Sequence, residues 1–442
     1  MNKLPTRREV LSGAMLAAAA GAAAGLHSTS CLASIALSPG EKERTHDTLV
    51  VIFLRGGADG LNIVPPYFED EYYRLRPMLS LAHPNDRRAS VTGRTVDLDG
   101  KFGLHPALSP LLPLYKQGQM AVLHAVGSGD NTRSHFEAVA AMETGNARNV
   151  GASSGWLARH LSATMREDDS PLRTVAITET MPDSLRGAPT AAALLHLSDY
   201  RLEVPSSSNR GRKPGTQPPV DRSLAMTSTL RTLYGSDQNS LSTAGKNTLD
   251  ALDAVKRLDP AHYRPARGVS YNTEPIGLGL KQAACLIKGR VGLEVACLEM
   301  QGWDTHVTQG KESGFQPTRL KELGGALAAF CTDIGTQLQG VTVVVMTEFG
   351  RRAYENTGLG TDHGRGGAWF VIGGGIRGGK VYTRWPGLHK SQLDEGNDLK
   401  VTTDYRDVLA DVLVNRMGAT NLNAVFPDHA VHLPGLAHSG NV

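Results

Sequence analysis

The chain has 442 residues, and its 46 lysine and arginine residues nearly balance its 43 aspartate and glutamate residues, for a net charge of +3. A charge this small, mixed along the whole chain, gives no indication of a nucleic-acid-binding protein. Aromatic residues make up only 5% of the chain, which argues against a stacking platform for sugars or bases.

The first 33 residues are predicted to be a targeting segment rather than part of the fold. Lys3, Arg7 and Arg8 form a basic start, and Thr6–Leu11 resembles a twin-arginine export motif. The Ala- and Gly-rich stretch 10–26 is too short and too weakly apolar to favour the alternative, an N-terminal membrane helix. Cleavage after Ala33 would give a periplasmic or secreted protein without a stable membrane span, delivered by the twin-arginine export machinery.

Short apolar runs rich in β-branched residues predict strands that are buried on both faces of a sheet. They lie at residues 49–54, 120–123, 174–177, 292–296, 341–346 and 369–372. Helical patterns separate them at residues 106–116, 136–142, 280–288, 318–338 and 405–414. Strands that alternate with helices predict a three-layer α/β/α sandwich with a mostly parallel central sheet.

The mature chain, residues 34–442, is predicted to form one large domain with an insertion at about 180–275. Residues 205–220 are polar and rich in Pro, Gly and Ser, which is typical of a loop or linker. Residues 222–275 are helical and charged, with little strand signal. Two interpretations remain open, because the insertion could cover a site or be a plain surface excursion.

Four motifs that carry carboxylate, imidazole or hydroxyl side chains each follow a predicted strand. They are Gly56–Asp59, Thr132–His135, Trp303–His306, and the segment from Glu348 to His363. Ligands bind in the crevice at the strand ends of an open α/β sheet, so we expect these side chains to lie close together. Carboxylates and imidazoles beside a hydroxyl predict a metal-assisted hydrolase.

The sequence around these motifs resembles a known family. The blocks VVIFLRGGADGLNIVPPY, TRSHFEAVAAMETG, WDTH, TEFGRRAYENTGLGTDHGRGG and TTDYRDVLADVL occur in the order typical of domain-of-unknown-function family 1501. The similarity covers roughly residues 47–436. The family is placed by resemblance in the alkaline phosphatase and sulfatase superfamily, which implies an alkaline phosphatase-like fold and a site more than a substrate.

The resemblance also implies ligands for a divalent metal. In the superfamily an aspartate after the first strand binds metal, and Asp59 matches it; the alternative is an aspartate that bonds its own backbone in a turn. Asp304 and His306 lie two residues apart, whereas the superfamily pair is usually four apart. Glu348 matches a carboxylate at a strand end, and Phe349 stands where a second ligand would be. The expected ligands are Asp59, Asp304, His306, Glu348, Asp362 and His363, and they favour Zn²⁺ or Mn²⁺, or Ca²⁺ if oxygen ligands dominate.

Ser134 is the candidate nucleophile, because it opens a predicted helix whose free N–H groups and positive dipole end stabilise an anionic oxygen. The superfamily places its nucleophile before a helix here, and Thr132 is the second candidate. Ser134–Glu137 also has the form of a capping box, so Ser134 could instead only cap the helix. The Cys-x-Pro-x-Arg motif of sulfatases is missing, which argues against formylglycine chemistry. Substrate contacts are expected from Asn62, Arg133, His135 and Arg351, and Arg133 and His135, which flank Ser134, could either bind an anion or serve a metal.

Together these residues predict an exported metal-dependent hydrolase of phosphate or sulfate esters, in which the metal activates a hydroxyl nucleophile. The resemblance allows an anionic ester of a glycan or a lipid as the substrate. The alternative function is a non-catalytic binding or assembly factor that retains the fold and a partial metal site. Phe349 and the short spacing between Asp304 and His306 favour this alternative.

Overall fold

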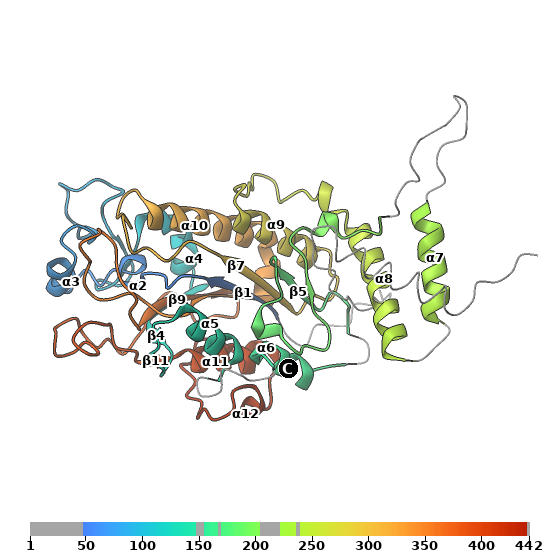
Figure 1. The fold of residues 1–442 in the computed structure, drawn as a ribbon. Helices are drawn as coiled ribbons and strands as arrows, with labels where there is room; N and C mark the ends of the chain where they lie inside the picture. The colour runs from blue at the N-terminus through green and yellow to red at the C-terminus, as the bar shows by residue number, and fades with distance from the viewer. Residues whose placement is uncertain (1–46, 147–153, 167–168, 204–221, 236–238, 440–442) are drawn as a thin grey trace, which may run out of the picture.

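The computed structural model describes residues 47–146, 154–166, 169–203, 222–235 and 239–439 (Figure 1). The predicted targeting segment and the predicted loop at 205–220 lie outside the described residues. Within the described ranges, no helix combines the length and the apolar character that a membrane span requires.

The described part of the chain contains one sheet of nine strands, in the order β10-β4-β9-β8-β1-β7-β5-β6, with β11 beside β4. Only β9 runs antiparallel to its neighbours, and the remaining pairs are parallel. The strands are β1 (Thr48–Leu54), β4 (Met120–Gly127), β5 (Thr174–Ile177), β6 (Ala192–Ala193), β7 (Val295–Met300), β8 (Val341–Thr347), β9 (Gly367–Gly373), β10 (Val381–Tyr382) and β11 (Thr403–Asp404). A separate hairpin pairs β2 (Val96–Asp97) with β3 (Gly103–Leu104).

Helices cover both faces of the sheet, so the predicted three-layer α/β/α sandwich with a mostly parallel sheet is confirmed (Figure 1). One layer contains η1 (Pro106–Leu111), α4 (Leu112–Lys116), α9 (Pro275–Lys288) and α10 (Phe315–Ile334), which continues into η5 (Gly335–Gly340). The other contains α5 (His135–Thr144), α6 (Trp156–Ala163), α11 (Tyr405–Met417) and α12 (Leu422–Val425). The short helices α2 (Gly60–Ile63) and α3 (Asp70–Leu75) follow β1, and three further turns are η2 (Asp183–Leu185), η3 (Leu197–Asp199) and η4 (Pro260–His262).

The first part of the predicted insertion contributes β6 to the edge of the main sheet, so only its later part lies outside the sandwich. That part contains α7 (Arg222–Gly235) and α8 (Ser240–Leu258), which pack against each other. Figure 1 shows both at the end of the molecule opposite α2, the helix that follows the carboxyl end of β1. These two helices therefore lie away from the motifs at the strand ends.

The strand β1 explains why the central strands read as continuous apolar runs. All seven of its residues are buried. Val50, Ile52 and Leu54 belong to the hydrophobic core on one face, and the alternating residues Leu49, Val51 and Phe53 belong to the core on the other face. Because successive side chains of a strand point to opposite faces, a strand between two helical layers needs apolar residues at every position.

One predicted strand is displaced along the chain. The sequence predicts a strand at 292–296, whereas β7 spans Val295–Met300. Gly292 has a φ of +80°, a left-handed backbone conformation that does not fit a strand, and the strand begins three residues later. The shift carries β7 up to the loop that bears Asp304.

A partly buried ionic group fixes α5 to the ends of two strands. Arg55, directly after β1, donates from Nη2 to Glu143 Oε1 of α5 at 2.9 Å, and also bonds to Glu299 of β7. Glu143 accepts a second bond, from the Asp183 backbone N–H at 2.9 Å. Burial raises the pKa of Glu143 to about 7, although the charge of Arg55 acts in the opposite direction.

We predict that Glu143→Gln changes how stability depends on pH. The folded protein keeps the Glu143 proton up to about pH 7, while the unfolded chain loses it near pH 4.5. The unfolded state therefore binds fewer protons in this window, so the free energy of unfolding of the wild type falls as the pH rises through it. Urea unfolding should show that the stability of Glu143→Gln, relative to wild type, increases from pH 4.5 to 7 and is constant above. Glu179→Gln, at an exposed position after β5, is the control, and a pH-independent difference for Glu143→Gln would contradict the prediction.

Candidate metal centre

The topology of the sheet brings the sequence motifs to one edge. The strands β1, β4, β7 and β8 point the same way, because β1 is parallel to β7 and β8 while β9 is antiparallel to both β8 and β4. Their carboxyl ends lead to Gly56, to Ser134 and His135, to Asp304 and to Glu348. Because β9 runs in the opposite direction, the loop that carries His363 returns to this same edge.

Asp304 is the centre of a cluster of three imidazoles. Its Oδ1 lies 3.0 Å from His306 Nε2 and 3.1 Å from His363 Nε2. Its Oδ2 lies 3.4 Å from His135 Nε2. The Nε2 atoms of His306 and His363 are 2.9 Å apart. Imidazole nitrogens from three separate segments of the chain therefore gather around the carboxylate of Asp304.

The other nitrogen of each imidazole bonds to an acceptor outside the cluster. His135 Nδ1 lies 2.8 Å from Glu348 Oε1, His306 Nδ1 lies 3.0 Å from Asp362 Oδ1, and His363 Nδ1 lies 2.7 Å from the Arg133 carbonyl oxygen. Carboxylate and carbonyl oxygens only accept, so these bonds place the proton of each neutral imidazole on Nδ1.

The remaining nitrogen lone pairs then face one another, which is unfavourable without a cation between them. His135 Nε2 is buried and has no hydrogen-bond partner, in agreement with this assignment. Histidines that ligate a metal through one nitrogen usually donate the other N–H to a carboxylate or carbonyl, as all three do here. The ligand atoms of His135, Asp304 and His363 all lie within 4.8 Å of one another, so these three residues fit a divalent metal. His306, whose Nε2 lies 3.0 Å from Asp304 Oδ1, adds a fourth donor beside them.

The carboxylates of the site are held in their charged form. Burial disfavours the charge on Asp304, but hydrogen bonding and the charge of Arg351 outweigh it, and the pKa of Asp304 falls to about 2. Burial likewise opposes ionisation of Glu348 and Asp362, yet bonds from His135 to Glu348 and from His306 to Asp362 lower the pKa of both carboxyls.

The histidines respond differently to their surroundings. The bond to Glu348 raises the pKa of His135, whereas burial lowers the pKa of His363.

The sequence predicts that Arg351 contacts the substrate. In the structure its side chain instead holds together the loops around the cluster. Its side chain is fully buried and donates to Asp304 Oδ1 at 2.6 Å. It also donates to the backbone carbonyls of Gly57 at 2.6 Å, Thr361 at 2.8 Å and Trp303 at 3.1 Å, and bonds to that of Gly56. This single guanidinium joins the loops after β1, β7 and β8.

Two glycines allow these loops to approach so closely. A Cβ on Gly56, whose φ is +122°, would lie 2.5 Å from the Asp304 backbone nitrogen. A Cβ on Gly360 would lie 2.3 Å from the His306 carbonyl oxygen. Side chains at either position would push the ligand loops apart.

The structure places the expected metal ligands in two layers. Asp304, His306 and His363 point into the cluster, while Glu348 and Asp362 bond to the outer nitrogens of His135 and His306. His135, expected as a substrate contact, lies among the ligands. The available sequence signal was that His135 follows a predicted strand and stands next to Ser134.

Asp59 lies in a different, fully buried network. Its Oδ2 accepts from Arg76 Nη1 at 2.5 Å and from Gln309 Nε2 at 2.6 Å. Gln309 Oε1 in turn accepts from the hydroxyls of Thr305 at 2.9 Å and Thr361 at 2.6 Å. Through Gln309, Asp59 therefore supports Thr305 and Thr361, the neighbours of Asp304 and Asp362. Nothing in the sequence indicates that Arg76 is the partner of Asp59.

Two predicted substrate contacts have other partners in the structure. Asn62 is buried, with Nδ2 donating to the Leu79 carbonyl at 2.8 Å and Oδ1 accepting from Tyr72 at 3.0 Å. Arg133 forms salt bridges with Asp398 at 2.6 Å and Glu395 at 2.9 Å, which hold the loop before α5.

Ser134 and Thr132 lie in the segment between β4 and α5, close in the chain to His135. Ser134 is the N-cap residue of α5, but its hydroxyl makes no capping bond, so the capping-box alternative does not describe this helix. The residue before it bonds to His363 through its carbonyl, and the residue after it is His135. The Thr132 hydroxyl instead donates to Glu137 Oε2 at 2.5 Å.

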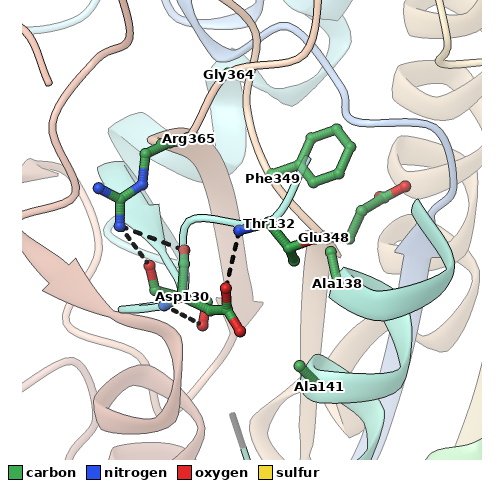
Figure 2. Close-up of a pocket in the computed structure, with 9 residues that line it drawn as sticks. Asp130, Thr132, Ala138, Ala141, Glu348, Phe349, Gly364 and Arg365 are labelled. Atoms are coloured by element: carbon green, nitrogen blue, oxygen red, sulfur yellow. Dashed lines mark hydrogen bonds between the residues drawn. The ribbon is translucent and has the colours of Figure 1, made fainter. Parts of the chain in front are cut away.

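A small pocket beside the cluster has room for about one water molecule. Figure 2 shows Asp130 and Arg365 on one side of it, with Glu348 and Phe349 across from them. Phe349, in the position of an expected second ligand, packs its ring 4.9 Å from that of His135 and 5.0 Å from that of His363. Phe349 therefore forms an apolar wall of the cluster.

Fold and site together define a class of protein, a three-layer α/β protein with a candidate metal centre of three histidines and one aspartate at the edge of a mostly parallel sheet. Residues 46–426 match the family described as protein of unknown function (DUF1501), and the chain belongs to this family. Among curated proteins, none matches the sequence significantly.

Three solved structures are similar to the chain at low sequence identity. The C-terminal periplasmic domain of EcEptC from Escherichia coli, in complex with Zn, is 7% identical with a TM-score of 0.31, covering 75% of this chain and 74% of that one. The PsFucS1 sulfatase from Pseudoalteromonas sp. is 13% identical with a TM-score of 0.30, covering 98% and 78%. A mutant of the alkaline phosphatase PafA is 13% identical with a TM-score of 0.26, covering 72% and 65%. At these scores the similarity says nothing about the reaction.

We predict that removing a central imidazole abolishes metal binding. His306→Ala and His363→Ala each delete one of the converging nitrogens, so zinc affinity should fall at least about hundredfold. Elemental analysis after dialysis against zinc should give about one ion per wild-type chain and almost none for either variant. His262→Ala, at an exposed histidine of η4, should retain the metal; equal metal content in all four proteins would refute the site.

We further predict that Glu348→Gln weakens metal binding without deleting a ligand. Glutamine keeps the size of the side chain but removes the charge that orients His135, so zinc affinity should fall about 10- to 100-fold. Calorimetric titration with Zn²⁺ measures the change. Glu312→Gln, on an exposed loop, is the matched control, and an unchanged affinity for Glu348→Gln would show that the carboxylate does not support the site.

Proposed function

We propose that the protein is an exported hydrolase of phosphate or sulfate esters that uses a divalent metal and a hydroxyl nucleophile. The observation that supports this most is the clustering of three imidazole Nε2 atoms around Asp304, with Ser134 directly before His135 in the chain. Export by the twin-arginine route rests on the motif Thr6–Leu11, in a segment outside the described residues.

The donor set favours Zn²⁺ or Mn²⁺. Three imidazole nitrogens and one carboxylate oxygen suit zinc and related transition metals, whereas calcium takes oxygen ligands throughout. His135, Asp304, His306 and His363 would hold the ion. When bound, such an ion supplies Lewis acidity, which neutralises ester oxygens and lowers the pKa of a coordinated hydroxyl or water.

Ser134 is the proposed nucleophile. Its hydroxyl is free of a capping role, and it stands at the amino end of α5, where unpaired backbone N–H groups favour a negative charge. The bond from His363 Nδ1 to the Arg133 carbonyl fixes the backbone before Ser134, and His135 fixes the backbone after it. Binding an anionic ester there would place it next to the exposed side of the cluster, since Asp304 and His306 are 47% and 40% exposed.

The second candidate function is a non-catalytic binding or assembly factor. The ligand set contains four side chains, and four protein ligands complete the tetrahedral shell of a structural zinc site, whereas catalytic sites usually keep a position open. The apolar ring of Phe349 against two of the imidazoles also favours this function.

We predict that Ser134→Ala abolishes ester hydrolysis and that Thr132→Ala does not. Loss of the nucleophile should lower kcat by about a thousandfold or more, while loss of the Thr132 hydroxyl removes only a bond to Glu137. Both variants should bind zinc as the wild type does. The measurement is turnover of 4-nitrophenyl phosphate, bis(4-nitrophenyl) phosphate and 4-nitrophenyl sulfate by zinc- or manganese-loaded protein. Metal binding without turnover of any of these esters would favour the binding factor, and equal turnover by Ser134→Ala would exclude Ser134 as the nucleophile.

A further inference from the structure

Three large apolar side chains are exposed next to the ligand residues. Phe136 directly follows His135 and is 90% exposed, and Val307 directly follows His306 and is 60% exposed. Leu359 is 46% exposed, on the loop between Glu348 and His363. We call Phe136, Val307 and Leu359 the apolar rim.

The backbone holds two members of the rim side by side. Thr308 donates its N–H to the Gly358 carbonyl at 2.9 Å, and Gln309 donates to the Leu359 carbonyl at 2.9 Å. A Cβ on Gly358 would lie 3.3 Å from Val307 Cγ1, so the two segments are in contact. Asn356 Nδ2 bonds to the His306 carbonyl at 2.9 Å and to Asp362 Oδ1 at 3.0 Å. The loop with Leu359 is therefore tied directly to a ligand and its outer carboxylate.

Leu359 also has an unfavourable backbone conformation. Its φ is +58°, and Thr308 opposite has a φ of +49°. The left-handed region is unfavourable for a residue with a Cβ, and an exposed leucine recovers little of this cost through packing within the chain. Strain of this kind beside a site points to a side chain that packs against a ligand rather than against the fold.

We propose that the apolar rim binds the hydrocarbon part of the substrate, so that the substrate is an amphiphilic phosphate or sulfate ester with an alkyl chain rather than a glycan. The inference rests on the proposed function, because the cluster would hold the anionic group of the same molecule. The exposed polar ligands and the exposed apolar rim lie next to each other in the chain, which matches a molecule with a charged head and an apolar tail. The side chains of the rim offer no hydrogen-bonding groups with which to recognise a sugar.

The experiment measures binding of non-hydrolysable alkylphosphonates to zinc-loaded, full-length protein. Methylphosphonate, butylphosphonate and octylphosphonate share one charged group and differ only in chain length. Octylphosphonate should bind at least about tenfold more tightly than methylphosphonate to the wild type, because partial burial of each added methylene is favourable. In Leu359→Gly, and more strongly in the double variant Phe136→Ser, Val307→Ser, this ratio should approach one, while the Kd of methylphosphonate stays as in the wild type.

Leu359→Gly keeps the test independent of folding, because glycine adopts the left-handed backbone without strain. Leu224→Ser is the matched control, since Leu224 is 60% exposed on α7 at the far end of the molecule and its substitution should leave the ratio unchanged (Figure 1). Methylphosphonate binding with no dependence on chain length would overturn this inference and leave the proposed function standing. A chain-length effect that persists in the variants would place the apolar contacts elsewhere and also overturn it. If no phosphonate binds to the metal-loaded protein, the proposed function fails and this inference fails with it.

Discussion

The site depends on the contact between Asp304 and Arg351. One oxygen of Asp304 accepts from a fully buried guanidinium and lies about equally far from two imidazole nitrogens. The same guanidinium bonds to carbonyls in the loops after β1, β7 and β8, so the position of the carboxylate and the positions of the loops are set by one side chain. A lysine could not replace it, because an ammonium group cannot bond in the plane to so many acceptors at once.

The charges around the cluster explain why it suits a divalent cation. Asp304, Glu348 and Asp362 have lowered pKa values and favour their charged forms, and the buried guanidinium of Arg351 bonds to only one of these carboxylates. The three imidazoles are neutral when each carries its proton on Nδ1. Partly buried carboxylates are costly without compensation, and a divalent cation held by the imidazole nitrogens would supply it.

Much of this arrangement could be predicted from the sequence because it follows from local rules. Continuous apolar runs such as 49–54 and 341–346 predict central parallel strands, and polar motifs directly after such strands predict a shared edge. The sequence could not show which carboxylates face the metal position and which bond to the histidines. Glu348 and Asp362 have the chemistry of ligands, but the orientation of His135 and His306 makes them acceptors for the Nδ1 atoms of these imidazoles. The role of Asp59 could not be predicted either, because its partner Arg76 lies outside the motifs. The antiparallel direction of β9, which returns His363 to the edge, also has no signal in the apolar run of that strand.

The position of His135 decides how the two candidate functions differ physically. Its Nε2 lies 3.4 Å from Asp304, farther than the Nε2 atoms of His306 and His363, and its Nδ1 is bonded to a carboxylate that raises its pKa. As a fourth ligand it would complete the metal shell and leave no position for an ester. As a residue that only borders the ion, it would leave that position open and hold the backbone of Ser134 next to it. Because His135 is the first residue of α5, and the ionic group of Arg55, Glu143 and Glu299 fixes the other end of this helix, the way α5 begins determines which of these two roles His135 takes.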